Sequence, residues 1–494
     1  SIEKMTGPKV DIGRDLVAFV AGQSSYSLSD TAGESYPEAA DAIRVIGGSA
    51  GGTIPFALRE DKFGTATGVP GIEQKRTAEG SIEGYVMPSG TLNVIPDMGA
   101  DLLVNGGWKI VNNSSTTTAV SGGASTAVKV NVNSVTGFSV GDGIIVETGN
   151  GTGFYEARRI IEVNSSATPD FIKVEPALTF SPVASATVKG VISYKPSDER
   201  DDAEDACCLW LMNNNSADRI SGWTPDSYEF TMGGEDAARF TASGTGQRHD
   251  RLFQTGLDGD LATGDAQVTV VEGLASAGDA VNTYWLLENG GATAPEAVKV
   301  TAISGATWTI TRGAVSGFPN PGSTWSASNT TMRPFRPTGS YAGSPVPATS
   351  GQLVVSPYGA TQGLSLQINN ASLSCSFGVT TRDDVMGTLY KAQGYTMNQR
   401  EVRATLSGWT LKDENMSAHT YAFQAAATAG ANSQQLSVAC QTGEAAGSIF
   451  AWVAPRMRQE DVSLDRGAEE VTLDMTGLCE GTSSGADEIL IIFA

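Results

Sequence analysis

The chain has 494 residues, of which 40% are hydrophobic and 17% charged, the composition of an ordinary globular protein of two to four domains. Its 54 acidic and 32 basic residues leave a net charge of −22, which argues against tight binding of DNA or RNA phosphates. Only two histidines, His249 and His419, occur, so the commonest acid–base and metal-binding side chain is nearly absent.

The five cysteines are odd in number and form no CxxC pair, which predicts reduced, buried thiols in a protein made in the cytoplasm. Residues 1–14 are polar and do not read as a signal peptide. No apolar run approaches the roughly 18 residues needed to cross a bilayer, so no membrane insertion is expected. The cysteines are Cys207, Cys208, Cys375, Cys440 and Cys479.

Strand signals dominate the chain from front to back. Residues 128–132 alternate apolar and polar side chains, as do residues 436–440 and 449–453. A period of two predicts strands with one buried and one solvated face, as in antiparallel sheets. The expected fold class is therefore all-β with minor α.

Two stretches can be superposed, residues 76–106 on residues 400–430. In both, a strand with a Gly-aromatic end leads into a predicted helix, over residues 97–104 and 413–428. An aspartate at the start and a glycine after the end favour helix termini. A second match follows, because residues 238–244 superpose on residues 471–477. The chain therefore contains two copies of one unit.

The first copy is longer because a small β module interrupts it, and a related module follows. Gly137 to Asp142 and Glu156 to Ile160 in the first module match Gly273 to Asp279 and Glu296 to Val300 in the second. The domains expected are residues 1–111 and 197–255 (first unit), 112–196 (first module), 256–335 (second module) and 336–494 (second unit).

Residues 400–494 resemble the tail tube (major tail) proteins of long-tailed, siphovirus-type bacteriophages. The matching features are a strand ending in Gly408-Trp409, one helix, a strand ending in Pro455-Arg456, and a final acidic-to-apolar strand ending at Phe493. Residues 76–108 and 227–244 resemble the same family. The similarity covers about two thirds of the chain and consists of soft patterns rather than invariant residues.

The resemblance implies a fold and a function. In that family each domain is a small β-sandwich flanked by one helix, and six domains form a ring whose inner sheets join into a β-barrel. Stacked rings form the hollow tail tube through which the genome passes. Two domains in one chain imply homotrimeric rings with pseudo-sixfold symmetry, in a virion tail assembled in the host cytoplasm. The implied partners are tape-measure, tail-tip and tail-terminator proteins, together with DNA that passes transiently.

Two further expectations follow from this resemblance. Segments from Gly47 to Gln74 and from Thr380 to Asn398 are expected to be loops that reach neighbouring subunits or the next ring. An acidic lumen would repel phosphates, so that DNA slides without sticking. The densest acidic run, residues 198–205, is a candidate lining, although a solvated surface is the role we expect for it.

Three glycine- or aspartate-rich motifs resemble parts of known catalytic or binding sites. Residues 47–51 match the Gly-x-Ser-x-Gly elbow of hydrolases, but a glycine-rich stretch follows instead of a helix, and the late His419 lies in a predicted helix. A flexible loop is expected there. Asp258, Asp260 and Asp265 lack the closing glutamate of a calcium loop, which predicts a turn. Residues 149–153 read as a hairpin turn rather than a phosphate cradle.

The remaining candidates are single residues or pairs. Cys207-Cys208 precedes an apolar run and is predicted to be core. His249-Asp250 is predicted to be an exposed loop pair without a catalytic role. Four tryptophans in strand-like runs are predicted to lie in the core or in subunit contacts: Trp308, Trp325, Trp409 and Trp452.

The sequence therefore favours a structural protein rather than an enzyme, with no catalytic, cofactor-binding or metal residues and no cofactor. The alternative is a secreted or surface-layer adhesive protein built from Ig-like β repeats. A third class, a β-rich glycan hydrolase or tailspike, needs paired carboxylates in a cleft, and the sequence leaves it open.

Overall fold

The structure is a computed structural model that describes residues 16–22, 36–57, 72–197, 207–233, 236–271, 281–290, 293–318, 323–357, 363–366, 368–382, 386, 395–410, 435–465, 472–481 and 485–494. This part of the chain is nearly all β, with short helical segments at η2 (Ala39–Asp41), η3 (Gly99–Leu103) and η4 (Ala348–Ser350). The predicted class, all-β with minor α, is confirmed. The helix predicted over residues 413–428 lies outside the described residues.

The first unit consists of two antiparallel sheets that share one long strand, β16. One sheet has the order β3-β6-β17-β16 and the other the order β2-β1-β15-β16-β18. The strands are β1 (Val17–Gly22), β2 (Ala42–Ile43), β3 (Gly47–Thr53), β6 (Thr77–Tyr85), β15 (Cys207–Met212), β16 (Ser216–Gly233), β17 (Arg239–Gly246) and β18 (Arg248–Phe253).

The second unit has the same plan, with β32 as the shared strand. Its sheets have the orders β27-β30-β33-β32 and β26-β25-β31-β32-β34. Two strands from the first part of the chain extend the latter sheet beyond β34: β14 (Ile192–Pro196) and then β7 (Trp108–Asn112). The other strands are β25 (Gln352–Pro357), β26 (Leu364–Leu366), β27 (Asn370–Ser376), β30 (Glu401–Thr410), β31 (Gln435–Thr442), β32 (Phe450–Asp465), β33 (Thr472–Cys479) and β34 (Leu490–Phe493).

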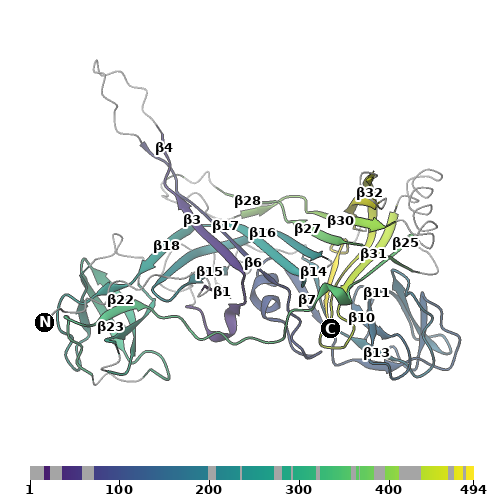
Figure 1. Ribbon diagram of the computed structural model, residues 1–494, viewed down its shortest axis with the longest axis horizontal. Helices are drawn as coiled ribbons and strands as arrows, with labels where there is room; N and C mark the ends of the chain where they lie inside the picture. Colours follow the sequence, from purple (N-terminus) through teal and green to yellow (C-terminus); the bar gives the residue numbers. More distant parts are fainter. Residues whose placement is uncertain are drawn as a thin grey trace, which may run out of the picture.

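Two separate six-stranded sheets form modules at opposite ends of the elongated molecule (Figure 1). Module 1 has the order β8-β13-β10-β11-β12-β9, and module 2 has the order β19-β24-β21-β22-β23-β20. Module 1 comprises β8 (Thr117–Ala119), β9 (Lys129–Val132), β10 (Gly143–Glu147), β11 (Tyr155–Asn164), β12 (Asp170–Glu175) and β13 (Thr187–Gly190). Module 2 comprises β19 (Thr255–Gly256), β20 (Gln267–Thr269), β21 (Tyr284–Glu288), β22 (Glu296–Ser304), β23 (Thr307–Arg312) and β24 (Thr331–Pro334).

Two small hairpins occupy the segments that were expected to be loops. The first pairs β4 (Phe56–Ala57) with β5 (Ile72–Glu73), and the second pairs β28 (Val379–Thr381) with β29 (Tyr395–Met397). Figure 1 shows β4 on an arm that projects from the body beyond β3. The expectation of a loop from Gly47 onward is wrong, because residues 47–53 pair along their whole length with β6.

One hydrophobic core runs through both units. It contains Ile82 and Leu209 of the first unit together with Phe450 and Trp452 of the second, all fully buried. The contact between Phe230 on β16 and Phe450 on β32, with ring centroids 5.7 Å apart, joins the two halves. The two units therefore share one hydrophobic core instead of each having its own.

The expectation of one solvated face per strand is wrong for β31 and for the N-terminal half of β32. Side chains on both faces of these strands are buried. Module 1 covers the second face, because Ile145 and Ala157 of the module belong to one cluster with Ala439 and Val453 of the unit. Alternating hydrophobicity cannot signal this second contact, since small apolar residues such as alanine serve either environment.

The helical segment η3 lies inside the predicted range of residues 97–104, but its ends differ from the prediction. Asp97 does not cap it; its carboxylate accepts hydrogen bonds from the Ala342 N–H at 3.0 and 3.3 Å. The left-handed residue after the helix is Gly107, with φ of 90°, rather than Gly106. Gly106 is needed for close approach, because a Cβ there would lie 1.5 Å from the Tyr228 hydroxyl.

Candidate functional site

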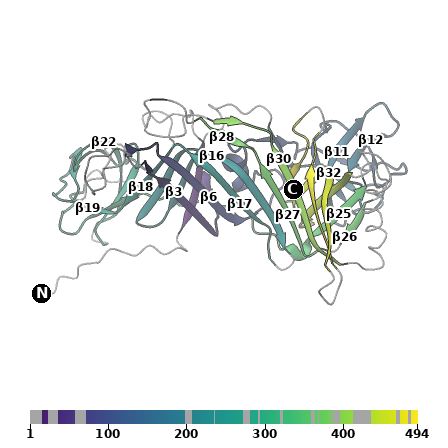
Figure 2. The same cartoon turned by 90° about the horizontal axis from the view of Figure 1, so that it is seen from above.

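The two units are joined edge to edge. Strand β16 of the first unit pairs with β27 of the second over seven positions, from Ser227 opposite Ser376 to Gly233 opposite Asn370. Eight strands therefore run side by side across the molecule in the order β3-β6-β17-β16-β27-β30-β33-β32, most of them visible in Figure 2. We call these eight strands the shared sheet, and the β16–β27 junction its seam.

The two halves of the shared sheet have the same register. Ser81 on β6 lies opposite Ser243 on β17, and Thr405 on β30 lies opposite Thr476 on β33. These are the residues that the sequence match superposes, Ser81 on Thr405 and Ser243 on Thr476. Strands β3 and β27 have equivalent places as well, since each pairs with the next strand of its half over seven positions.

Both halves also contain a β-bulge at the same place. Strand β16 skips Asp226 where it pairs with β17, and β32 skips Glu460 where it pairs with β33. We call the other sheet of each unit, β2-β1-β15-β16-β18 and β26-β25-β31-β32-β34, its outer sheet. Strand β16 pairs in the outer sheet up to Trp223 and in the shared sheet from Thr224, and β32 pairs in the outer sheet up to Arg458 and in the shared sheet from Met457, so each bulge lies just after the change of sheet. A bulge bends a strand and increases its twist, so both β16 and β32 are bent close to the point where they enter the shared sheet.

The two ends of the shared sheet have open edges within the described residues. Strand β3 pairs only with β6, and the stretch of β32 from Asp461 to Asp465 pairs only with β33. Strand β3 has the sequence GGSAGGT, and five of its seven residues are exposed. It carries no proline, lysine or bulge, the devices with which proteins protect an edge against pairing.

One face of the shared sheet is solvated and rich in hydroxyl groups. In β6, β17, β27 and β30, buried side chains alternate with exposed or half-buried ones, as the period of two predicts. Hydrogen bonds link hydroxyls across strands, at 2.8 Å between Ser49 and Ser81 and 2.7 Å between Ser227 and Ser243. The Ser and Thr residues of this face include Thr77, Ser81, Thr241, Ser243, Ser227, Thr231, Ser372, Ser374, Ser376, Thr405 and Thr476.

Acidic side chains outnumber basic ones on this face. Its two arginines are both paired with acids: Arg239 with Asp236 and, at 3.5 Å, with Glu83, and Arg403 with Glu401 and Glu460. Hydrogen bonds from Arg239 lower the pKa of Asp236, so that acid stays ionised. Three further acids on the face, Glu79, Glu229 and Asp474, have no arginine partner among the residues that the structure describes. The face therefore has a net negative charge and leaves no described arginine to bind phosphate.

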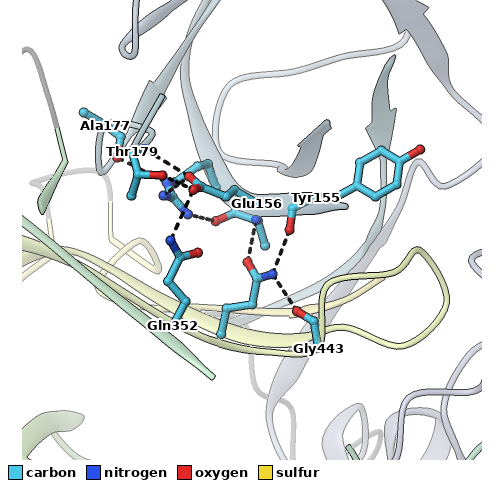
Figure 3. A network of polar contacts seen from close by, with 9 residues as sticks. Tyr155, Glu156, Ala177, Thr179, Gln352 and Gly443 are labelled. Carbon is cyan, nitrogen blue, oxygen red and sulfur yellow. Dashed lines mark hydrogen bonds and ion pairs between the residues drawn. The ribbon is translucent and has the colours of Figure 1, made fainter. Parts of the chain in front are cut away.

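Module 1 is attached to the second unit by a buried polar network, shown in Figure 3. The Gln441 side chain accepts a hydrogen bond from the Ala157 N–H at 2.8 Å and donates to the carbonyls of Tyr155 and Gly443 at 2.8 and 2.7 Å. The carboxylate of Glu156 accepts from Arg158 at 2.5 Å and from Gln352 at 3.2 Å. These contacts fix one orientation of the module on the unit.

Module 2 lies against the equivalent outer sheet of the first unit. Tyr36 fills the junction, with its ring 5.1 Å from that of Trp210 and 4.8 Å from that of Tyr284. Beside it Arg219 donates hydrogen bonds of 3.0 and 2.6 Å to the Asp250 carboxylate, and both side chains are almost fully buried. Burial raises the pKa of the Tyr36 hydroxyl well above its ordinary value, so the phenol stays protonated.

Most of the cysteines and tryptophans named as candidates lie in the described part of the chain. Cys207 and Cys208 are buried core residues, as predicted, and all five cysteines, which lie in the described part of the chain, are buried and form no disulfide. Burial raises the pKa of Cys440 and Cys479 to about 12, so these thiols do not ionise. Trp308, Trp325 and Trp452 are fully buried, as predicted, while the Trp409 side chain lies outside the described residues.

The prediction that His249-Asp250 forms an exposed loop is wrong. Both residues lie in strand β18, His249 contacts Asp218 at 2.9 Å, and Asp250 is 4% exposed in the ion pair with Arg219. Strand β18 pairs with β16, which provides the arginine and the aspartate. Two polar residues in a row suggest a loop, and only the partner strand explains why Asp250 is buried and His249 half-buried.

The glycine and aspartate motifs have structural roles. Residues 47–51 form strand β3, so the flexible loop expected there is wrong. Residues 149–153 form the hairpin turn between β10 and β11, as predicted. Asp260 and Asp265 accept backbone hydrogen bonds of 2.8 and 2.7 Å from Ala327 and Ala262 in a turn, also as predicted. The acidic run at residues 198–205 and His419 lie outside the described residues.

Among the residues that the structure describes, no three His, Cys, Asp or Glu side chains are grouped so that they could hold a metal ion. The described helical segments include none that is long and apolar enough to span a membrane. No protein-family model matches the chain, and no curated protein is significantly similar to it. The edges and the solvated face of the shared sheet are therefore the features from which a function must be argued.

Proposed function

We propose that this chain is a structural subunit that assembles with copies of itself into the hollow tail tube of a long-tailed bacteriophage. The observation that carries the proposal is the seam. Two similar units are joined inside one chain by pairing β16 with β27, and the same two kinds of edge are open at the ends, β3 and the C-terminal stretch of β32.

Open edges of this kind favour assembly over a monomer. An exposed glycine-rich edge is a template for pairing with another chain. When β32 of each copy pairs with β3 of the next, the copies form a closed ring if the rotation from one copy to the next divides a full turn evenly. The shared sheets then join into a closed β-barrel, which has no open edges. The resemblance to tail tube proteins, in which six domains form a ring, supports three chains per ring.

The composition of the solvated face supports DNA passage as the role of the lumen. Curling the shared sheet with this face inward would line a channel with hydroxyls and with acids such as Glu79 and Glu229, which have no arginine partner in the described part of the chain. Carboxylates repel phosphates, and short hydroxyl side chains leave the bore open. Tape-measure, tail-tip and tail-terminator proteins are the partners that a tube of this kind implies, in a virion tail assembled in the host cytoplasm.

Electron microscopy of the purified protein tests the proposal. The protein is concentrated, with and without seeding by tail-tip components, and imaged in negative stain. Hollow rings or tubes with three- or sixfold end views are the expected result. Monomers alone under all conditions, confirmed by sedimentation, would reject the tube and favour the adhesive alternative.

A further inference from the structure

We infer that β32 of one copy pairs with β3 of the next copy in a defined antiparallel register, with Asp461 opposite Thr53, Ser463 opposite Gly51 and Asp465 opposite Ser49. The inference rests on the proposed self-assembly and adds the residue-level geometry of the contact between copies. It follows from the seam inside the chain, because the two units share their strand order, their register and their bulges.

The register between copies follows if β32 pairs with β3 of the next copy in the same way as β16 pairs with β27 at the seam. Strand β27 corresponds to β3, since Ser372 lies opposite Thr405 as Ser49 lies opposite Ser81. Strand β32 corresponds to β16, since the residue after the bulge is Asp461 in one and Ser227 in the other. The seam pairs Ser227 with Ser376, and its copy therefore pairs Asp461 with Thr53.

The two edges are physically suited to this pairing. Gly51 is exposed, and a Cβ added there would meet nothing within 4 Å. Ser463 on β32 is exposed as well. Strand β3 has the seven residues of the seam, and the described open stretch of β32, Asp461 to Asp465, provides five positions opposite Thr53 to Ser49. Pairing would satisfy backbone groups that are otherwise left to water.

The same register determines the tilt of the strands. Ser49 on β3 is connected through directly opposite residues on β6, β17 and β16 to Ser376 on β27. The residue of β27 that is equivalent to Ser49 in the second unit is, however, Ser372. The sheet thus shifts by four residues over four strands. A shift of one residue per strand tilts the strands by about 35° from the tube axis, whatever the number of copies.

A tilt of this size lies in the range of known barrels. With six units in a ring, the barrel would have a backbone radius of about 22 Å. This bore remains open after short serine and threonine side chains are added, and it is wide enough for a DNA duplex. If β32 paired with β3 without this four-residue shift, Ser463 would lie opposite Gly47 instead of Gly51. The position of Ser463 along β3 therefore distinguishes the two registers.

Cysteine cross-linking distinguishes the two registers. In Gly51→Cys/Ser463→Cys the new thiols are opposite each other in the inferred register, within about 5.5 Å between Cβ atoms. In the control Gly47→Cys/Ser463→Cys the glycine lies on the same strand and face but four residues away, about 13 Å along the strand. Gly47 also has open space for a side chain, and the five native cysteines are buried.

The variants are assembled under reducing conditions, imaged, and then oxidised, with each single-cysteine variant as a blank. We expect cross-linked dimers and trimers from the Gly51 pair, at least tenfold more than from the Gly47 pair. Preferential cross-linking of the Gly47 pair would overturn the register. Tubes in which neither pair cross-links would overturn the β32–β3 contact while leaving the tube function intact. Absence of any assembly in the unmodified protein would overturn both proposals.

Discussion

Gln441 on β31 of the second unit accepts a 2.8 Å hydrogen bond from the backbone N–H of Ala157 on β11, a residue 284 positions earlier in the chain. Module 1 is inserted in the chain of the first unit, yet its polar contacts and its apolar face are directed to the second. The module therefore ties the two units together independently of the seam.

Replacing Gln441 by leucine should loosen this attachment. The change removes three hydrogen bonds and leaves the Ala157 N–H and the Tyr155 carbonyl buried without these partners. We expect the free energy of unfolding to fall by about 2 to 4 kcal/mol, measured by urea denaturation. The control is Gln435→Leu on the same strand, which loses one half-buried bond to Glu480 and should cost under about 1 kcal/mol. Equal losses in the two variants would contradict the role of Gln441.

The buried ion pair of Glu156 and Arg158 gives a second prediction. The two side chains are 3% and 1% exposed, and Glu156→Ala leaves the arginine charge without its carboxylate. We expect a loss of about 3 to 5 kcal/mol. On the same strand, Glu162 pairs with Lys173 at 2.6 Å but both are more than a third exposed, so Glu162→Ala should cost under about 1 kcal/mol. Thermal and chemical denaturation of the two variants provide the comparison.

Asp101 in η3 should make stability depend on pH. Burial, and to a smaller extent the Asp41 carboxylate, raises the pKa of Asp101 to about 6. The folded state therefore holds the proton more tightly than the unfolded chain, and stability falls as pH rises from about 4 to about 6. Asp101→Asn should remove this contribution, so that its melting temperature exceeds that of the unmodified protein at pH 7 but not at pH 4. A constant difference between the two proteins across this range would refute the assignment.

The projecting arm beyond β3 should matter for stacking rather than for folding. The Gln74 N–H donates to the Pro55 carbonyl at 2.7 Å, so the two sides of the arm meet there. Replacing residues 56–73 by Asn-Gly should close the hairpin with a tight turn. We expect an unchanged melting temperature and a loss of long tubes in electron micrographs, with rings retained. Tubes of normal length from this variant would show that the arm makes no axial contact.

The sequence predicts best what local patterns and repetition determine. Alternating residues indicated antiparallel strands, and the match of Ser81 to Thr405 and of Ser243 to Thr476 agrees with the observed register. Turn chemistry at residues 149–153 was also sufficient to place a hairpin. In these cases the determining interactions lie within a few residues of each other or recur in the second copy.

Features that depend on distant partners were missed. Strand β3 reads as a loop because glycine has low strand propensity, and only its pairing with β6 makes it a strand. Asp250 reads as exposed because the buried Arg219 that neutralises it is 31 residues away on β16. Likewise, nothing in the alternation of β31 indicates that module 1 covers its second face. Pairing and docking partners of this kind are not encoded in any short window of sequence.

The long strands β16 and β32 have a mechanical consequence. Each runs without interruption from an outer sheet into the shared sheet and is bent by a bulge just after it enters. A force that acts to separate the two layers is then opposed by covalent backbone at two points in every chain, in addition to side-chain packing. In the proposed tube, a wall built in this way should deform elastically by bending at the bulges before its layers peel apart.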